Sequence, residues 1–287
     1  MQPTLGHDLE PDFQAWIGRT EQVEDPLAVV QAQAAQATFE EAGPLITVGD
    51  ALPLPWHWFY FLPRAAQSAL DSDGHPQRGG FLPPIPYPRR MFAGARLTVH
   101  SPLRVGTPAV REATITGVTL KSGKSGSLAF VTVSNRFVQD GVLCLEEEQD
   151  IVYREPGGRV KAPLQAEWAP LPEGCWTRTF QPDTRLLFRF SALTFNAHRI
   201  HYDRAYASDV EGYPGLVVHG PLTAALLLQL VRQNTARPVR AFSFRGVMPI
   251  FDLGPVRLVG TLQGDALTLE AQGPDGAVAL AAQATLG

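Results

Sequence analysis

The chain has 287 residues, of which 45% are hydrophobic and 18% charged, with a formal net charge of −4 at pH 7. This balance excludes an intrinsically disordered chain, and the lack of a basic surplus argues against a general nucleic-acid binder. The length suggests about two domains, and two cysteines, Cys144 and Cys175, are too few for a disulfide framework.

The N-terminal segment shows no targeting signal, because residues 1–20 lack a basic start followed by an apolar run. No apolar stretch is long enough to span a membrane, so we expect a cytoplasmic protein without a membrane partner. Residues 10–42 are predicted to be helical, with Asp25 as a cap and Pro26 in the first turn. Residues 43–90 are predicted to be irregular, and they contain an aromatic cluster at 56–61.

The next segment has the apolar–polar alternation of strands. Residues 95–100, 109–120, 128–138 and 142–152 alternate, with turns at 122–126 and Asp140-Gly141. Proline and glycine are then spread over residues 156–184, which indicates a linker. We therefore predict an N-terminal domain at 1–155, a linker at 156–184 and a C-terminal domain at 185–287.

The second half repeats this pattern around an apolar helix. We expect a short strand at 185–190, a polar loop at 191–215, a helix at 221–233 and four more strands. The helix is apolar on nearly all sides and should be enclosed by other elements. Asp275-Gly276 matches Asp140-Gly141 as the turn before a last strand, a weak sign of internal duplication. The predicted class is α+β, a double hotdog in which two antiparallel sheets each curl around a central helix. The four strands are expected at 239–249, 255–263, 266–271 and 277–282.

A polar cluster precedes the apolar helix. It allows three interpretations: a surface loop, a metal site made of His198, His201, Asp203 and His219, or a catalytic site. Catalysis is favoured because the helix begins at Gly220, whose free backbone N–H can stabilise an oxyanion. His201 could transfer protons near neutral pH. A base beside an oxyanion site suits chemistry next to a thioester carbonyl.

Residues 195–203 (FNAHRIHYD) and 212–220 (GYPGLVVHG) resemble the MaoC-like (R)-specific enoyl-CoA hydratases. The usual motif in that family is D-x-N-P-x-H, with a later H-G that opens the central helix. The branch with mesaconyl-C4-CoA (3-methylfumaryl-CoA) hydratase and the fungal mitochondrial 3-hydroxyacyl-thioester dehydratases is more similar still. That branch also carries blocks similar to WHW at 56–58, GGFLPP at 79–84 and PRRMFAG at 88–94.

The resemblance implies a hydro-lyase with its active site in the second half, while the first half shapes a substrate tunnel. It would interconvert a 2-enoyl thioester and a 3-hydroxyacyl thioester, as in fatty acid metabolism. The resemblance makes His201 the catalytic base and the Gly220 amide the oxyanion hole. Asn196 stands where the wider family has a catalytic aspartate, and an amide cannot accept a proton near neutral pH. We therefore expect Asn196 to orient the water. His198 and Arg199 replace the Asn and Pro of the motif.

The expected substrate is an acyl-CoA or acyl-carrier-protein thioester, including a branched dicarboxylyl-CoA such as mesaconyl-C4-CoA. Coenzyme A enters as part of the substrate, and neither a cofactor nor a metal is expected. The residues expected to bind substrate are Arg89 and Arg90 for the phosphates of coenzyme A, Arg199 for a second carboxylate, and His219 and Trp56.

Two other functions remain open on the sequence. A hotdog thioesterase would need a carboxylate near the central helix, and residues 212–240 contain no Asp or Glu. A non-catalytic module that binds acyl thioesters is the other alternative, since fold alone does not settle function. The sequence is compatible with a monomer and with a homodimer.

Overall fold

The computed structural model describes residues 13–123 and 126–287. The start of the predicted first helix at residues 10–12, and the tip of the predicted turn at Lys124 and Ser125, lie outside these residues. Among the described helices, none combines the length and apolarity that a membrane crossing requires.

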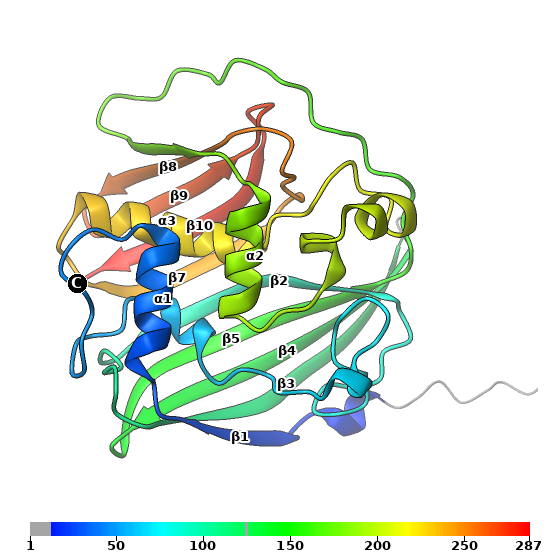
Figure 1. The fold of residues 1–287 in the computed structure, drawn as a ribbon, viewed down its shortest axis with the longest axis horizontal. Helices are drawn as coiled ribbons and strands as arrows, with labels where there is room; N and C mark the ends of the chain where they lie inside the picture. Colours follow the sequence, from blue (N-terminus) through cyan, green and yellow to red (C-terminus); the bar gives the residue numbers. More distant parts are fainter. Residues whose placement is uncertain (1–12, 124–125) are drawn as a thin grey trace, which may run out of the picture.

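Ten strands form one continuous antiparallel sheet that curls around the helices (Figure 1). The first half contributes the order β1-β3-β4-β5-β2, and the second half contributes β7-β10-β9-β8-β6. Strands β2 and β7 pair antiparallel and join the halves. The first-half strands are β1 (Thr20–Asp25), β2 (Arg89–Val99), β3 (Ala109–Gly123), β4 (Gly126–Gln139) and β5 (Val142–Arg154). The second-half strands are β6 (Trp176–Phe180), β7 (Val239–Gly246), β8 (Val256–Gln263), β9 (Ala266–Gln272) and β10 (Val278–Leu286).

The two halves have the same strand topology. Each half has five strands. Counted along the chain within a half, they lie side by side in the order first, third, fourth, fifth, second, starting from the outer edge of the sheet and ending at the β2–β7 junction. The sheet is therefore related to itself by an approximate twofold axis. This arrangement confirms the internal duplication and the double-hotdog fold that the sequence predicts.

Three helices lie inside the curled sheet: α1 (Val29–Phe39), α2 (Thr184–Leu193) and α3 (Gly220–Asn234) (Figure 1). Every residue of α3 from Leu222 to Val231 is buried, as expected of a helix that is apolar all round. Helix α1 packs against α2, where Phe39 meets Phe190 edge-on with ring centroids 6.4 Å apart. Short 3-10 turns at Phe13–Trp16, Trp56–Phe59, Gln67–Ala69 and Arg199–His201, and a π turn at Tyr206–Val210, complete the helical elements.

The prediction of one helix over residues 10–42 is wrong, because Thr20–Asp25 forms strand β1 on the edge of β3. Asp25 does not cap a helix here. Its carboxylate accepts hydrogen bonds from the backbone N–H groups of Leu27 (2.9 Å) and Phe61 (3.0 Å). These bonds fix a bend between the strand and α1, so the helix starts at Val29.

The strand predicted at residues 185–190 is also wrong, since these residues form most of α2. Asp183 decides the outcome: its Oδ1 accepts the backbone N–H of Leu186 at 2.8 Å and caps the helix. The predicted linker at 156–184 is partly wrong too, because Trp176–Phe180 forms β6 and pairs with β8.

Candidate active site

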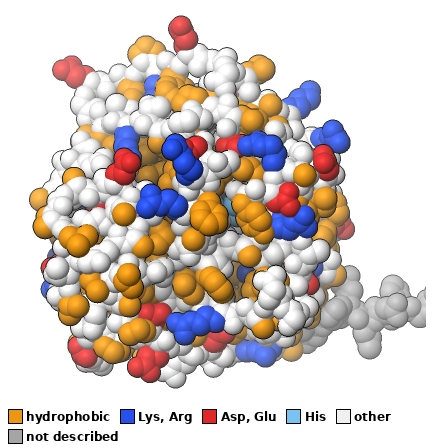
Figure 2. Space-filling model, in the orientation of Figure 1, with side chains coloured by type: hydrophobic (Ala, Val, Ile, Leu, Met, Phe, Trp, Pro, Cys, Tyr) orange, Lys and Arg blue, Asp and Glu red, His pale blue; other side chains and the backbone are white. Residues whose placement is uncertain are grey.

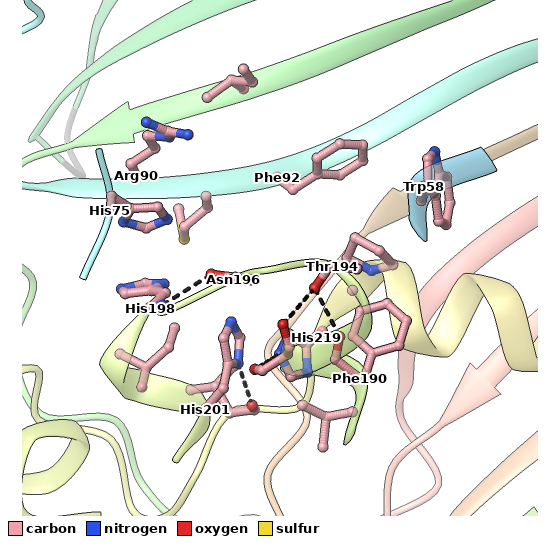
Figure 3. Close-up of a pocket in the computed structure, with 18 of the residues that line it drawn as sticks. Trp58, His75, Arg90, Phe92, Phe190, Thr194, Asn196, His198, His201 and His219 are labelled. Atoms are coloured by element: carbon pink, nitrogen blue, oxygen red, sulfur yellow. Dashed lines mark hydrogen bonds between the residues drawn. The ribbon is translucent and has the colours of Figure 1, made fainter. Parts of the chain in front are cut away.

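A cavity of about 1110 Å³ lies between the two halves of the molecule. Its walls come from β2, the Trp56–Phe59 turn, the segment after α2 and the N-terminus of α3. Figure 2 shows hydrophobic side chains gathered around a hollow in one face, with a histidine visible inside it. Four histidines, His75, His198, His201 and His219, line the part of the cavity drawn in Figure 3.

The loop that follows α2 places two of these histidines. Asn196 lines the cavity, and its Oδ1 accepts the backbone N–H of His198 at 3.0 Å, which tightens the loop. The 3-10 turn Arg199–His201 follows directly. His201 Nδ1 donates to the carbonyl of Val217 at 2.7 Å, because a carbonyl oxygen can only accept. Its Nε2 therefore carries the lone pair of the neutral ring.

The N-terminus of α3 opens onto the same cavity. Gly220 and Pro221 line it, and Gly220 N–H has no acceptor among the described residues. The space beside Gly220 is open, since a Cβ there would come no closer than 3.9 Å to the carbonyl oxygen of Phe92. The site thus combines a free amide at a helix N-terminus with a histidine lone pair.

His219 precedes Gly220 and stacks on His201 with ring centroids 3.6 Å apart. Its Nε2 is 2.9 Å from Ser191 Oγ, whereas its buried Nδ1 has no hydrogen-bond partner among the residues that the structure describes. Stacking on one face holds the His201 ring in place and keeps water off that face.

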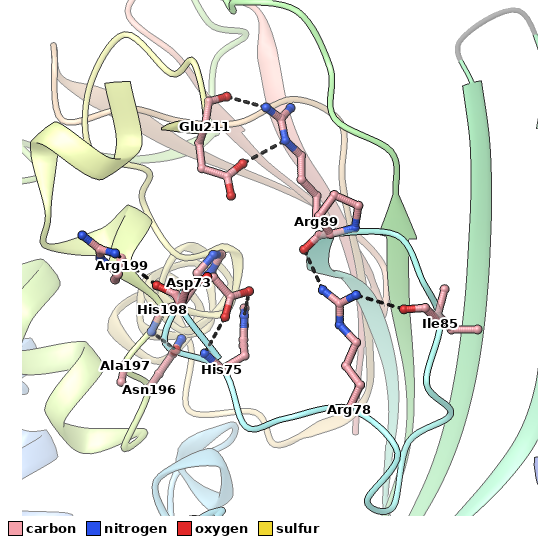
Figure 4. Close-up of polar contacts among 12 residues, drawn as sticks. Asp73, His75, Arg78, Ile85, Arg89, Asn196, Ala197, His198, Arg199 and Glu211 are labelled. Atoms are coloured by element: carbon pink, nitrogen blue, oxygen red, sulfur yellow. Dashed lines mark hydrogen bonds and ion pairs between the residues drawn. The ribbon is translucent and has the colours of Figure 1, made fainter. Parts of the chain in front are cut away.

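The fourth histidine comes from the first half of the chain. His75 Nδ1 is 3.0 Å from Asp73 Oδ2, and the other oxygen of Asp73 accepts the backbone N–H of His75 at 2.8 Å (Figure 4). The His75 ring lies 4.1 Å from that of His198, centroid to centroid. The Asp73 carbonyl accepts the backbone N–H of Arg199 at 2.8 Å, so this contact ties the halves together at the site.

Burial keeps the cavity histidines neutral. It lowers the pKa of His201 to about 4, although the hydrogen bond to Val217 opposes the shift. Burial also lowers the pKa values of His75, His198 and His219. A neutral His201 with a free Nε2 can accept a proton at neutral pH, as a general base must.

Asp73, His75 and His198 could hold a metal ion, since their donor atoms lie within 4.8 Å of one another. This is a different set from the one that the sequence indicates, because Asp203 is instead paired with Arg199. Both oxygens of Asp73 already accept hydrogen bonds from His75. A metal ligated by Asp73 would have to compete with those bonds, so the fit to a metal is poor. The expectation of a metal-free site stays a prediction.

Not all the predicted binding residues reach the cavity. Arg90 and His219 line it, together with Asn196, His201 and Gly220. Arg89 instead forms a buried ion pair with Glu211, Nε to Oε2 at 2.8 Å (Figure 4). Strand alternation explains the difference, because neighbouring side chains on β2 point to opposite faces.

Arg199 and Trp56 also lie outside the lining. Arg199 is partly exposed, pairs with Asp203 and sits over the Tyr206 ring at 4.2 Å. Trp56 is fully buried and stacks with Phe39. Trp58, two residues on, lines the cavity and donates from Nε1 to Glu147 at 2.7 Å. The short 3-10 turn directs the two indoles to different sides.

Sequence reasoning missed the Asp73–His75 pair. The signal available was the D-x-H spacing immediately before the GGFLPP block. That spacing alone does not predict a functional site, because the His75 ring packs against His198, which lies in the other half of the chain.

Comparison with known proteins indicates a family for this chain. Residues 55–252 match the family model described as "Hydroxyacyl-thioester dehydratase type 2". The mesaconyl-C(4)-CoA hydratase of Chloroflexus aurantiacus is 63% identical over 96% of this chain and 98% of that protein. The mitochondrial hydroxyacyl-thioester dehydratase type 2 of Schizosaccharomyces pombe is 28% identical over 76% of this chain and 82% of its own.

Solved structures support the fold. A Mycobacterium tuberculosis protein described as having a double hotdog fold superposes with a TM-score of 0.58 at 13% identity, covering 94% of this chain and 96% of that one. At this identity the likeness concerns the fold alone. The family model and the two relatives, rather than the fold, indicate the type of enzyme.

Proposed function

The chain belongs to the hydroxyacyl-thioester dehydratase type 2 family, and from that premise we propose that it hydrates a short dicarboxylyl-CoA of the mesaconyl-C4-CoA kind. The family assignment makes the chain a hydro-lyase that acts on acyl thioesters. The 63% identity to a mesaconyl-C(4)-CoA hydratase supports the choice of acyl group.

The reaction adds water across the double bond next to the thioester carbonyl. His201 Nε2 takes a proton from the water as the water oxygen bonds to the β-carbon. The π electrons move towards the thioester, whose oxygen becomes an enolate stabilised by the Gly220 N–H. The enolate then collapses, and the α-carbon takes the proton from His201 on the same face. Water and enoyl thioester are thus converted into the 3-hydroxyacyl thioester, and the base is restored.

One observation carries this proposal: the free Nε2 of a neutral, buried His201 and the free amide of Gly220 face one cavity. The pairing of a proton acceptor with an oxyanion donor is what enolate chemistry requires. We expect Asn196, which lines the same cavity, to orient the water through its amide.

A thioesterase would need a carboxylate to activate water or attack the carbonyl. Among the described residues that line the cavity, Glu147 is the only acidic one. Both of its oxygens are occupied, by Trp58 Nε1 and by His57 Nε2 at 3.3 Å. This arrangement favours hydration over hydrolysis.

The test is a paired assay of the purified protein with mesaconyl-C4-CoA and crotonyl-CoA. Loss of enoyl ultraviolet absorbance measures hydration, and a thiol reagent measures hydrolysis. We expect absorbance loss without thiol, and a decrease in kcat of at least about 100-fold in His201→Asn, because a general base is removed. His100→Asn is the control, since His100 is exposed and pairs with Glu146 on the surface. Thiol release, or full activity in His201→Asn, would contradict the proposal.

A further inference from the structure

Arg90 is an unpaired cation in the wall of the cavity. It lies near the start of β2, is half-buried and lines the cavity. Its guanidinium has no hydrogen-bond or ion-pair partner among the described residues. A partly desolvated arginine without an anion is unfavourable on its own, so the site is complete only when an anion enters the cavity.

The cavity offers no anion of its own for this role. Glu147 is engaged by His57 and Trp58, and Asp73 is engaged by His75. Of the other lining cations, Arg111 pairs with Glu21 at 2.6 Å, whereas Arg154 also has no partner among the described residues. The anion that satisfies Arg90 must therefore come with the substrate.

Arg90 lies at the histidine end of the cavity. In Figure 3 its side chain is directly above His75, whose ring lies against that of His198 with centroids 4.1 Å apart, and Asn196 lies beside His198. The phosphates of coenzyme A are separated from the thioester by the whole pantetheine arm. A cation next to His75, in the wall of the cavity that also holds His201 and Gly220, is thus nearer the acyl end of the substrate than those phosphates.

The acyl group of the proposed substrate brings an anion to this place. In a mesaconyl-C4 thioester the β-carbon carries a methyl group and the free carboxylate, so the charge sits on the carbon that water attacks. We propose that Arg90 binds this carboxylate and selects substrates with an anionic group on the β-carbon. The inference rests on the proposed hydratase function. It makes Arg90 the residue that distinguishes anionic from neutral acyl groups.

The electrostatics of the neighbours support this role. The charge of Arg90 adds to the effect of burial in lowering the pKa values of His75 and His198. Arginine beside neutral rings leaves its charge available to the ligand, and its planar fork can bind both carboxylate oxygens.

A matched pair of substrates tests the inference. 3-Methylcrotonyl-CoA differs from mesaconyl-C4-CoA only by a methyl group in place of the carboxylate. In Arg90→Met we expect kcat/KM for mesaconyl-C4-CoA to decrease roughly 100-fold or more, as for loss of one partner of a buried charge pair. In the same variant, kcat/KM should change less than about threefold with 3-methylcrotonyl-CoA and with crotonyl-CoA, a second neutral substrate. Arg90→Lys should retain part of the preference, because it keeps the charge without the fork.

Arg154→Met is the control for loss of a cavity cation. Arg154 also lines the cavity without a partner among the described residues, but it lies near Glu211 and Tyr213. The ratio of the two kcat/KM values should stay at the wild-type value in this variant.

Each contrary outcome has a distinct meaning. An equal decrease on anionic and neutral substrates in Arg90→Met would overturn the inference, because Arg90 would then act on a part common to both. Unchanged kinetics on both would overturn it as well. Circular dichroism of Arg90→Met separates these outcomes from misfolding, and the activity of Arg90→Lys decides the case if the Met variant does not fold. If the wild-type protein hydrated neither substrate, the proposed function would fall, and the inference with it.

Discussion

Asn196 is the residue at which this site departs most from a two-base hydratase. Its Oδ1 already accepts one hydrogen bond, from His198 N–H, and can accept a second from water. We expect Asn196→Ala to lower kcat about 100-fold, because the water loses its orientation relative to the β-carbon. Steady-state rates with mesaconyl-C4-CoA measure the effect.

Asn196→Asp is the matched variant, because it keeps an oxygen to accept the His198 N–H. A loss in the Ala variant that the Asp variant restores would assign the role to Oδ1, whereas a loss in both would assign it to the amide Nδ2. Unchanged turnover in Asn196→Ala would show that Asn196 does not position the water.

Sequence alone indicates His201, Asn196 and Gly220, because the loop and the helix start that carry them are neighbours along the chain. His75 could not be found in this way, since its contact with His198 exists only after the two halves pack together. The difference between Arg89 and Arg90 also depends on the fold. Both are arginines before an apolar strand, and only strand pairing sets which of them faces the cavity.

At the scale of elements, the loop before β2 meets the loop after α2 at Gly74. This glycine has a φ of 93°, and a Cβ on it would lie 1.8 Å from the carbonyl oxygen of Ala197. We expect Gly74→Ala to push the two loops apart and to separate Asp73 and His75 from His198. Turnover should decrease at least about tenfold, by analogy with small displacements of catalytic groups.

Gly49→Ala is the control for the backbone strain alone. Gly49 has a φ of 91° and nothing within 4 Å of its Cβ position. The Gly49→Ala variant should lose about 1 kcal/mol of unfolding free energy and keep normal turnover. Denaturant unfolding and kcat of both variants measure the difference, and equal turnover in the two would show that the loop contact at Gly74 does not support the reaction.

The elements that the sequence misassigned share one cause. Residues 185–190 (RLLFRF) are a short, mostly apolar run that suits a strand as well as a helix, but the Asp183 cap starts a helix that packs on α1. Thr20–Asp25 lies in a segment with helical composition, and pairing with β3 overrides that preference. Strands β3, β4 and β5 were predictable because they are long, and their short connections leave one pairing.

At the scale of the whole molecule, the buried histidines couple stability to pH. His201 has a pKa of about 4 when folded, against 6.5 for an unperturbed imidazole, so below pH 6.5 the unfolded chain binds protons that the folded chain does not. We expect the unfolding free energy to be level above pH 6.5 and to fall as the pH drops towards 4. The slope for each such histidine is up to about 1.4 kcal/mol per pH unit.

Guanidinium unfolding at pH 7.5, 6 and 5 measures this slope, and His201→Asn should reduce it. Asp73 does not contribute in this window. Although burial opposes the shift, the hydrogen bonds from His75 lower the pKa of Asp73 below the ordinary value of an aspartate, so its contribution to stability is lost only at lower pH. A level profile down to pH 5 would show that the cavity histidines titrate freely in the folded protein.

A fold with twofold repetition offers two equivalent helix N-termini, one at α1 and one at α3. Among the described residues, Gly220 and Pro221 at the start of α3 line the cavity, whereas Ala28 and Val29 at the start of α1 do not. On the proposed function, the molecule is a fused pair with one turnover centre per two repeats. The first repeat then has no proton-transfer groups to maintain, and its Arg90 and His75 line the cavity that Gly220 of the second repeat also lines. Substrate preference can thus change through mutations in one repeat while the proton-transfer groups of the other stay as they are.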